Sequence, residues 1–284
     1  MPKIFNEMLN QWVYLPEKPK RIVSLAPSIT DILVELGLIE KIVGVSRWCT
    51  PYLKGTEKPV VASVDKADYE FLEKLKPDLI LTTSGIHLKL ARELHSKGYS
   101  VFPVQLPRNV FEIVSNILLI GTITSKQRKA RELATQLIFE MENLRTNEKI
   151  KKVPDVYAEV WPNKFYITFG GLAFTNDFIH LAGGHNIFSE RPLDYFTPDF
   201  NEVEALNPDV MIFIFENREE MEQTDILSLT KKRGWEKIKA LKTGKMIIAS
   251  QNDLPLTHSG PSFINTIKML NVKFKELSLI TYNY

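Results

Sequence analysis

Aromatic side chains recur in the loops that are expected to follow strands of this chain. They are Trp48, Tyr52, Trp161, Phe165 and Tyr195. In open α/β sheets the ligand lies at the carboxyl ends of the strands, where such loops gather. Aromatic rings that face one another there suit a large, flat and partly apolar ligand. The alternative is that the same rings pack the loops onto the body of the protein.

The short motifs of common catalytic sites are absent from the sequence. It contains no G-x-S-x-G elbow, phosphate-binding loop, G-x-G-x-x-G fingerprint, C-x-x-C or H-E-x-x-H. Five histidines are scattered along the chain, and no direct metal site is predicted. His87 and His258 lie in loops after predicted strands, whereas His95 and His180 lie in helical patterns. We therefore expect a binding protein and not an enzyme.

Composition and charge narrow the class of protein further. Hydrophobic residues make up 44% of the 284 residues and charged residues 25%, the profile of a soluble globular chain. With a net charge of +2, the chain lacks the strong positive charge typical of nucleic-acid-binding proteins, so we expect no nucleic-acid partner. The single cysteine, Cys49, excludes an internal disulfide. No apolar run approaches the ~20 residues that span a bilayer.

The N-terminal segment bears on localisation. MPKIFNEMLNQWVYL lacks the order of basic, apolar and small residues that marks a secretory signal. Two expectations are open: the protein works in the cytoplasm, or the printed chain lacks its export segment.

Apolar runs alternate with helical patterns through most of the chain. KRIVSLAPSITDILVELG predicts a buried strand from Ile22 to Leu25, a break at Pro27 and Ser28, and a helix that ends at Gly37. The alternation begins again after Pro154. Strands that alternate with helices favour βα units and a mostly parallel sheet. We therefore predict an α/β protein with two Rossmann-like lobes.

One long helix is predicted between the two lobes. No Gly or Pro occurs from Ser125 to Val153, and apolar residues recur there at helical spacing. About 25 residues at 1.5 Å each make a rod of roughly 35–40 Å. The predicted domains are an N-terminal lobe (1–122), an interlobe helix (123–152) and a C-terminal lobe (153–284).

Two stretches of the chain read almost alike. They are DYEFLEKLKPDLILTT, from Asp68 to Thr83, and DFNEVEALNPDVMIFI, from Asp199 to Ile214. Each has an acid, an aromatic residue and a short helical pattern, followed by a Pro-Asp step and an apolar run. Because a proline ends the preceding helix, both stretches predict the same helix-to-strand junction, once in each lobe. The alternative is that the likeness reflects only the residues with which many α/β proteins end a helix and begin a strand.

Several segments together resemble a known family. PEKPKRIVSLAPSITDILVELGLIEKIVGVS, YEFLEKLKPDLILTT, LAGGHNIF, NEVEALNPDVMIF and HSGPSFINTIKML are similar to substrate-binding proteins of ABC importers for vitamin B12, ferric siderophores and haem. The likeness is strongest to the vitamin B12-binding type, and NQWVYLPEKP resembles the leading hairpin of the family. The family resemblance implies two lobes joined by the long helix and a cleft between the lobes that binds one ligand. It also implies a monomer and no cofactor.

The resemblance also implies roles for individual residues. By motif position, the residues that face the ligand are Trp48, Trp161, Phe165 and Tyr195. Those on the rim of the cleft are Pro27, Ser28, Ser84, Gly85 and His258. The implied ligand is cobalamin or a related corrinoid.

Two other ligands are weighed beside the corrinoid. An acidic ferric siderophore calls for several cations, and the candidate loops offer Arg47, Lys164 and Arg191 without an evident cluster. Haem calls for an axial His or Tyr, and His258 and Tyr195 keep that option open.

Members of this family dock on a membrane permease through one glutamate on each lobe, which meets an arginine pocket. Glu70 stands at the first position, where an acid in the first turn of a helix is also favoured by the helix dipole. Asn201 stands at the second position, next to Glu202 and near Asp199. The asparagine in place of a glutamate and the lack of a recognisable secretory signal motivate an alternative. In that alternative, the chain is a cytoplasmic protein or enzyme that handles corrinoids or metal chelates with the same fold.

Overall fold

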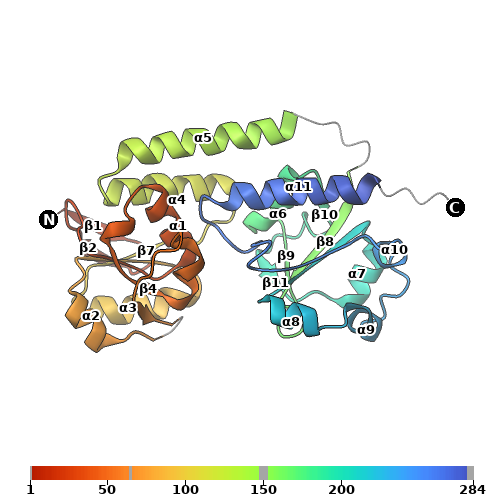
Figure 1. Ribbon diagram of the computed structural model, residues 1–284, viewed down its shortest axis with the longest axis horizontal. Helices are drawn as coiled ribbons and strands as arrows, with labels where there is room; N and C mark the ends of the chain where they lie inside the picture. The colour runs from red at the N-terminus through yellow and green to blue at the C-terminus, as the bar shows by residue number, and fades with distance from the viewer. Residues whose placement is uncertain (1, 64–65, 147–152, 280–284) are drawn as a thin grey trace. The chain divides into compact units, whose positions relative to one another are not determined.

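The computed structural model describes residues 2–63, 66–146 and 153–279. These residues divide into two compact units (Figure 1). The first unit contains residues up to 107, 111–138 and 258–262, and the second contains 108–110, 139–257 and the chain from 263 onward. The α/β class with parallel strands and flanking helices is confirmed.

The first unit is built on a parallel five-stranded sheet in the order β5-β4-β3-β6-β7. The strands are β3 (Ile22–Ser24), β4 (Ile42–Ser46), β5 (Val60–Ala62), β6 (Leu79–Thr83) and β7 (Val101–Val104). Its helices are α1 (Pro27–Glu35), α2 (Tyr69–Leu75), α3 (Leu88–Ser96) and α4 (Val110–Ile123). The central strands are buried along their whole length, as expected for a sheet covered on both faces. A separate antiparallel hairpin, β1 (Lys3–Asn6) and β2 (Gln11–Tyr14), matches the predicted leading hairpin.

The second unit contains a mixed sheet in the order β11-β9-β8-β12-β13, with β10 paired to β8. The strands are β8 (Asp155–Val160), β9 (Ile167–Phe169), β10 (His185–Asn186), β11 (Tyr195–Phe196), β12 (Val210–Phe215) and β13 (Met246–Ser250). Strands β8, β12 and β13 are parallel, whereas β9 runs antiparallel to both β8 and β11. The predicted mostly parallel sheet is confirmed, and antiparallel pairing is confined to β9 with its neighbours β8 and β11. The connection from β8 to β9 is only residues 161–166, too short for the crossover that a parallel pair needs.

Helices cover both faces of this second sheet. They are α6 (Phe174–Leu181), α7 (Phe200–Leu206), α8 (Arg218–Gln223), α9 (Ile226–Lys232), α10 (Lys239–Lys242) and α11 (Phe263–Leu279). In Figure 1, α6 and α11 lie on one side of the sheet and α8 and α9 on the other. On the α6 side, the rings of Phe178 and Phe263 stack 5.6 Å apart.

The long helix predicted from Ser125 is α5 (Gln127–Thr146). Ser125 itself lies between α4 and α5 with a left-handed backbone (φ 58°), so α5 is separate from α4. The predicted helix also included residues 147–152, which lie outside the described residues. The division between the two units falls within α5, after Ile138. The domain limits drawn from the sequence stay a prediction.

The two similar segments, 68–83 and 199–214, form the same helix-to-strand junction in the two units. Helices α2 and α7 are each seven residues long, and each begins at an aspartate. The carboxylate of Asp68 accepts a hydrogen bond from the backbone N–H of Phe71, and that of Asp199 accepts one from Asn201, both at 2.9 Å. These N-caps satisfy backbone donors that a helix leaves unpaired.

Both helices also end in the same way. Lys76 and Asn207 adopt left-handed backbones, with φ of 44° and 47°. Pro77 and Pro208 follow directly, and a proline disfavours the helical conformation in the residue before it. The chain therefore leaves each helix sharply and enters the buried strand, β6 in one unit and β12 in the other.

The aspartate after each proline holds the neighbouring strand. Asp78 accepts hydrogen bonds from the backbone N–H groups of Lys20 (2.7 Å) and Arg21 (3.0 Å), just before β3. Asp209 accepts one from Asp155 (3.3 Å), at the start of β8. The repeated Pro-Asp step thus ends a helix and fixes the entry of the adjacent strand.

Candidate functional site

The structure brings five predicted site residues to one edge of the first unit. Pro27 and Ser28 begin α1 directly after β3, Trp48 lies in the short helix after β4, and Ser84 and Gly85 follow β6. Strands β4, β3 and β6 are adjacent and parallel, so their carboxyl ends share one edge of the sheet. This is the edge at which open α/β sheets bind ligands.

Exposure at this edge differs from residue to residue. Trp48 is 48% exposed, whereas Pro27 and Ser28 are half-buried. Ser84 accepts a hydrogen bond from the backbone N–H of Leu106 (2.8 Å), which fixes the loop after β6. Ile86, which is not among the predicted site residues, is 72% exposed in the same loop. Its position after a buried strand was the only signal available.

His258 lies in a buried polar cluster of the first unit. Its Nε2 lies 2.9 Å from Oδ2 of Asp31 in α1, and Ser262 donates to the same oxygen from its backbone N–H (2.9 Å) and its hydroxyl (2.8 Å). The Tyr52 ring stacks on the imidazole, with centroids 4.0 Å apart and planes 8° from parallel. A Cβ on Gly260 would lie 2.5 Å from the His258 ring, so this turn has room only for glycine.

The electrostatics of this cluster centre on Asp31. Burial would raise the pKa of this carboxyl, but the hydrogen bonds and charge of His258, with the bonds from Ser262, outweigh burial and hold the pKa below its ordinary value. Asp31 is therefore a carboxylate, and its Oδ2 accepts a hydrogen bond from the Nε2–H of His258. Because His258 is only 5% exposed and Nε2 is engaged, that nitrogen is not available as an axial metal ligand in this state.

The second unit presents two of the predicted aromatic residues on one loop. Trp161 and Phe165 belong to the connection between β8 and β9, at the carboxyl end of β8. Phe165 is 61% exposed, and its ring meets that of Trp161 edge to face, with centroids 6.2 Å apart. Trp161 is half-buried, so Phe165 is the ring of this pair that is open to solvent.

Tyr195 differs from these two because it lies in a strand. It belongs to β11 and is half-buried, with its ring 5.6 Å from that of Phe169 in an edge-to-face contact. Burial, with the nearby charge of Asp194, raises the pKa of Tyr195 far above its ordinary value. This phenol stays neutral at any physiological pH.

The cations of the candidate loops in the second unit are paired with carboxylates. Lys164 Nζ lies 2.9 Å from Glu216, which raises the pKa of this lysine, and Arg191 forms an ion pair with Glu202. A polar cavity of about 360 Å³ adjoins this part of the loop, lined by Asn163, Lys164, Asn217, Glu219, Glu220, Gln223 and Thr224. Among the described residues, no group of three or more His, Cys, Asp or Glu is arranged to hold a metal ion.

The predicted docking residues occupy corresponding places in α2 and α7. Glu70 and Asn201 are both exposed in the first turn of their helices. The two neighbours of Asn201 that could replace a glutamate are engaged: Glu202 pairs with Arg191, and Asp199 caps α7. The two units therefore differ in charge at this position.

Within residues 2–63, 66–146 and 153–279, no helix has the length and apolar character to cross a membrane.

Comparison with known proteins places the chain among binding proteins. It is 26% identical over 277 residues to the uncharacterized ABC transporter substrate-binding lipoprotein YvrC of Bacillus subtilis (strain 168), covering 95% of this chain and 84% of the relative. It is 26% identical over 223 residues to the vitamin B12-binding protein of Yersinia pestis (strain Pestoides F), covering 75% and 76%. A crystal structure described as a possible iron-binding (periplasmic solute-binding) protein from Staphylococcus epidermidis ATCC 12228 superposes with a TM-score of 0.74 at 27% identity, covering 90% and 99%.

The periplasmic binding protein family matches residues 22–252, which is most of the chain. The predicted resemblance is thereby confirmed. With its two α/β units and aromatic loops at the carboxyl ends of strands, this chain belongs to the periplasmic binding protein family.

Proposed function

We propose that this protein is the substrate-binding component of an ABC importer and that its ligand is cobalamin or a related corrinoid. The observation that carries the proposal is the edge-to-face pair of half-buried Trp161 and exposed Phe165 on the loop after β8. Trp48 adds an exposed aromatic ring at the strand ends of the first unit. Rings of this kind bind the apolar faces of a large ligand and leave its chemistry unchanged.

The charges near these rings favour a ligand without a strong negative charge. A ferric siderophore with acidic groups would need unpaired cations, because a buried or partly buried anion is held by charge-assisted hydrogen bonds. Lys164 and Arg191 are instead neutralised by Glu216 and Glu202, and the exposed Arg47 beside Trp48 is a single cation and not a cluster. The vitamin B12-binding relative supports the same ligand class.

Haem is the second ligand class that sequence reasoning left open. A neutral histidine nitrogen and a tyrosine phenolate are two of the groups that serve as axial ligands for haem iron. Nε2 of His258 is hydrogen-bonded to Asp31, so it is not free to bind iron. The pKa of Tyr195 is raised far above its ordinary value, so its phenol does not readily become a phenolate. Haem is therefore the weaker candidate.

Titration of the purified protein with a panel of ligands tests the proposal. Visible absorbance and calorimetry would follow cobalamin, cobinamide, haem and a ferric hydroxamate siderophore under one buffer condition. We expect saturable binding of a corrinoid and weak or no binding of the siderophore. Tight binding of the siderophore or haem, with no corrinoid binding, would contradict the ligand assignment while leaving the family membership intact.

A further inference from the structure

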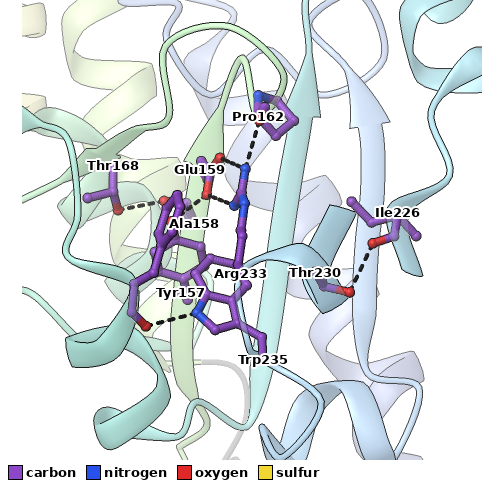
Figure 2. A network of polar contacts seen from close by, with 10 residues as sticks. Tyr157, Ala158, Glu159, Pro162, Thr168, Ile226, Thr230, Arg233 and Trp235 are labelled. Atoms are coloured by element: carbon purple, nitrogen blue, oxygen red, sulfur yellow. Dashed lines mark hydrogen bonds and ion pairs between the residues drawn. The ribbon is translucent and has the colours of Figure 1, made fainter. Parts of the chain in front are cut away.

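A buried ion pair connects β8 of the second unit to the segment after α9 (Figure 2). Glu159 is fully buried in β8, and the side chain of Arg233 is 3% exposed. Arg233 donates from Nη1 to Oε2 of Glu159 (2.7 Å) and from Nη2 to Oε1 (2.9 Å). The hydroxyl of Tyr157 also donates to Oε2. This bidentate geometry is the strong and directional form of an arginine–carboxylate contact.

Arg233 also holds the loop that carries Trp161 and Phe165. Its Nη2 donates a second hydrogen bond, to the backbone carbonyl of Pro162 (2.7 Å), as Figure 2 shows. Its guanidinium lies over the ring of Tyr166, 5.1 Å from the centroid. Pro162 and Tyr166 stand near the two ends of the connection between β8 and β9, so one side chain contacts both ends of the loop.

Aromatic rings fix the guanidinium in place. It lies 4.7 Å from the centroid of Phe200 and 4.8 Å from that of Trp235. The indole N–H of Trp235 donates to the carbonyl of Phe200 (2.9 Å), which ties these two rings together. A cation between aromatic faces has little freedom to move, so the position of Nη2 under Pro162 is set by packing.

The loop itself adopts a backbone that needs such support. Trp161 and Tyr166, its first and last residues, both have left-handed backbones, with φ of 53° and 52°. Such conformations are costly for aromatic residues and persist only where surrounding contacts enforce them. Inside the loop, the N–H groups of Lys164, Phe165 and Tyr166 all point to the carbonyl of Trp161, at 3.0, 3.1 and 3.3 Å. These bonds close the turn from inside, and the hydrogen bond from Arg233 to Pro162 adds an anchor from outside it.

We propose that Arg233, held by Glu159, is a positioning residue that sets the conformation of the 161–166 loop and so presents Trp161 and Phe165 to the ligand. The inference rests on the proposed function, because it assigns the loop to ligand binding. A lysine cannot replace this arginine, since a single ammonium group cannot reach both carboxylate oxygens and the Pro162 carbonyl with one planar fork.

The test must separate positioning from general stability. Replacing a buried ion pair by two apolar residues of similar volume often preserves stability, so Glu159→Met/Arg233→Met removes the anchor of the loop without leaving a buried charge unpaired. Arg233→Lys retains the charge and loses the fork. Val203→Ala serves as a matched control, because Val203 is fully buried in the same unit and contacts no loop residue through a hydrogen bond.

Amide hydrogen exchange of the ligand-free protein is the first readout. We expect the amides of Lys164, Phe165 and Tyr166 to exchange about tenfold faster or more in the double variant and in Arg233→Lys, because local opening becomes easier. In Val203→Ala the same amides should exchange as in the wild type, even if urea unfolding shows lower stability. Unchanged exchange at these three amides in the double variant would overturn the proposal.

Ligand affinity is the second readout. For cobinamide, we expect the double variant to lose affinity by a factor comparable to that of Trp161→Ala. Faster exchange with undiminished affinity would also overturn the proposal, since the loop would then not be positioned for this ligand. Failure of the proposed function looks different: the wild type itself would bind no corrinoid, while the exchange of the ligand-free loop would still report whether Arg233 positions it.

Discussion

At the scale of single residues, burial decides which polar groups meet a ligand and which hold the protein together. Asp31 and His258 come from positions 227 residues apart and bond inside the first unit. Their cluster connects α1 with the five-residue segment 258–262, which belongs to the first unit although the chain on both sides of it belongs to the second. We interpret His258 as a structural residue of this segment.

The first prediction concerns the pH dependence of this cluster. The folded protein holds the pKa of Asp31 below its ordinary value of 3.8, so the contribution of this carboxylate to stability is present above that pH and is lost as the pH falls below it. Asp31→Asn should therefore lower the free energy of unfolding by about 1–3 kcal/mol at pH 7 and by less at pH 3. Urea unfolding at both pH values measures this difference, with Glu57→Gln, at an exposed carboxylate, as the control. A difference that does not change with pH would contradict the assignment.

The second prediction concerns Phe165, the exposed ring of the aromatic pair. Phe165→Ala should leave the free energy of unfolding nearly unchanged, because the residue is 61% exposed, and should weaken corrinoid binding by about 1–2 kcal/mol through loss of ring contact. Calorimetry with cobinamide measures the affinity. Phe111→Ala removes an equally exposed phenylalanine (66%) of α4 and should change neither quantity. Equal loss of affinity in both variants would mean that Phe165 has no special contact with the ligand.

At the scale of elements, the junction from helix to strand is the feature that sequence predicted best. The N-cap aspartate, the proline and the apolar run are local signals, and each has the same structural outcome in α2–β6 and α7–β12. The pairing of β9 with β11 could not be assigned from a repeating pattern, because these strands are only three and two residues long. Two or three residues are too few to show the alternation of apolar and polar side chains that marks a strand. The contact of Arg233 with Glu159 was also beyond sequence reasoning, because 74 residues separate partners that only the folded sheet brings together.

The third prediction tests the role of the aspartate in the repeated junction. Asp78→Ala removes two hydrogen bonds from backbone N–H groups before β3, so it should lower the free energy of unfolding by about 1–3 kcal/mol. Urea unfolding measures the loss. Lys74→Ala, at an exposed position of the adjacent α2, should change stability by less than about 0.5 kcal/mol. Equal effects of the two substitutions would show that the Pro-Asp step has no anchoring role.

At the scale of the whole molecule, each unit carries one copy of the junction, and their exposed first turns differ in charge. Glu70 is the exposed acid of the first copy, whereas the second has Asn201 beside a Glu202 that is already paired with Arg191. If the protein delivers its ligand to a permease, the two units contribute unequally to that contact.

The fourth prediction follows from this asymmetry. Glu70→Ala should weaken association with the cognate permease, because it removes a charge-assisted contact, and should leave corrinoid affinity unchanged. Asn201→Ala should affect neither measurement strongly. Co-purification with the permease in detergent, alongside calorimetry, gives both readouts. A loss of ligand affinity in Glu70→Ala would place this residue in the binding site or the fold instead.

The ligand proposed for this member of the periplasmic binding protein family is a corrinoid. Calorimetric titration of the wild-type protein with cobalamin and cobinamide tests this assignment most directly. We expect one corrinoid to bind per chain with a dissociation constant of about 1 µM or tighter, which corresponds to a binding free energy of roughly −8 kcal/mol. Absence of heat and of any spectral change with both corrinoids, for a protein shown to be folded, would contradict it.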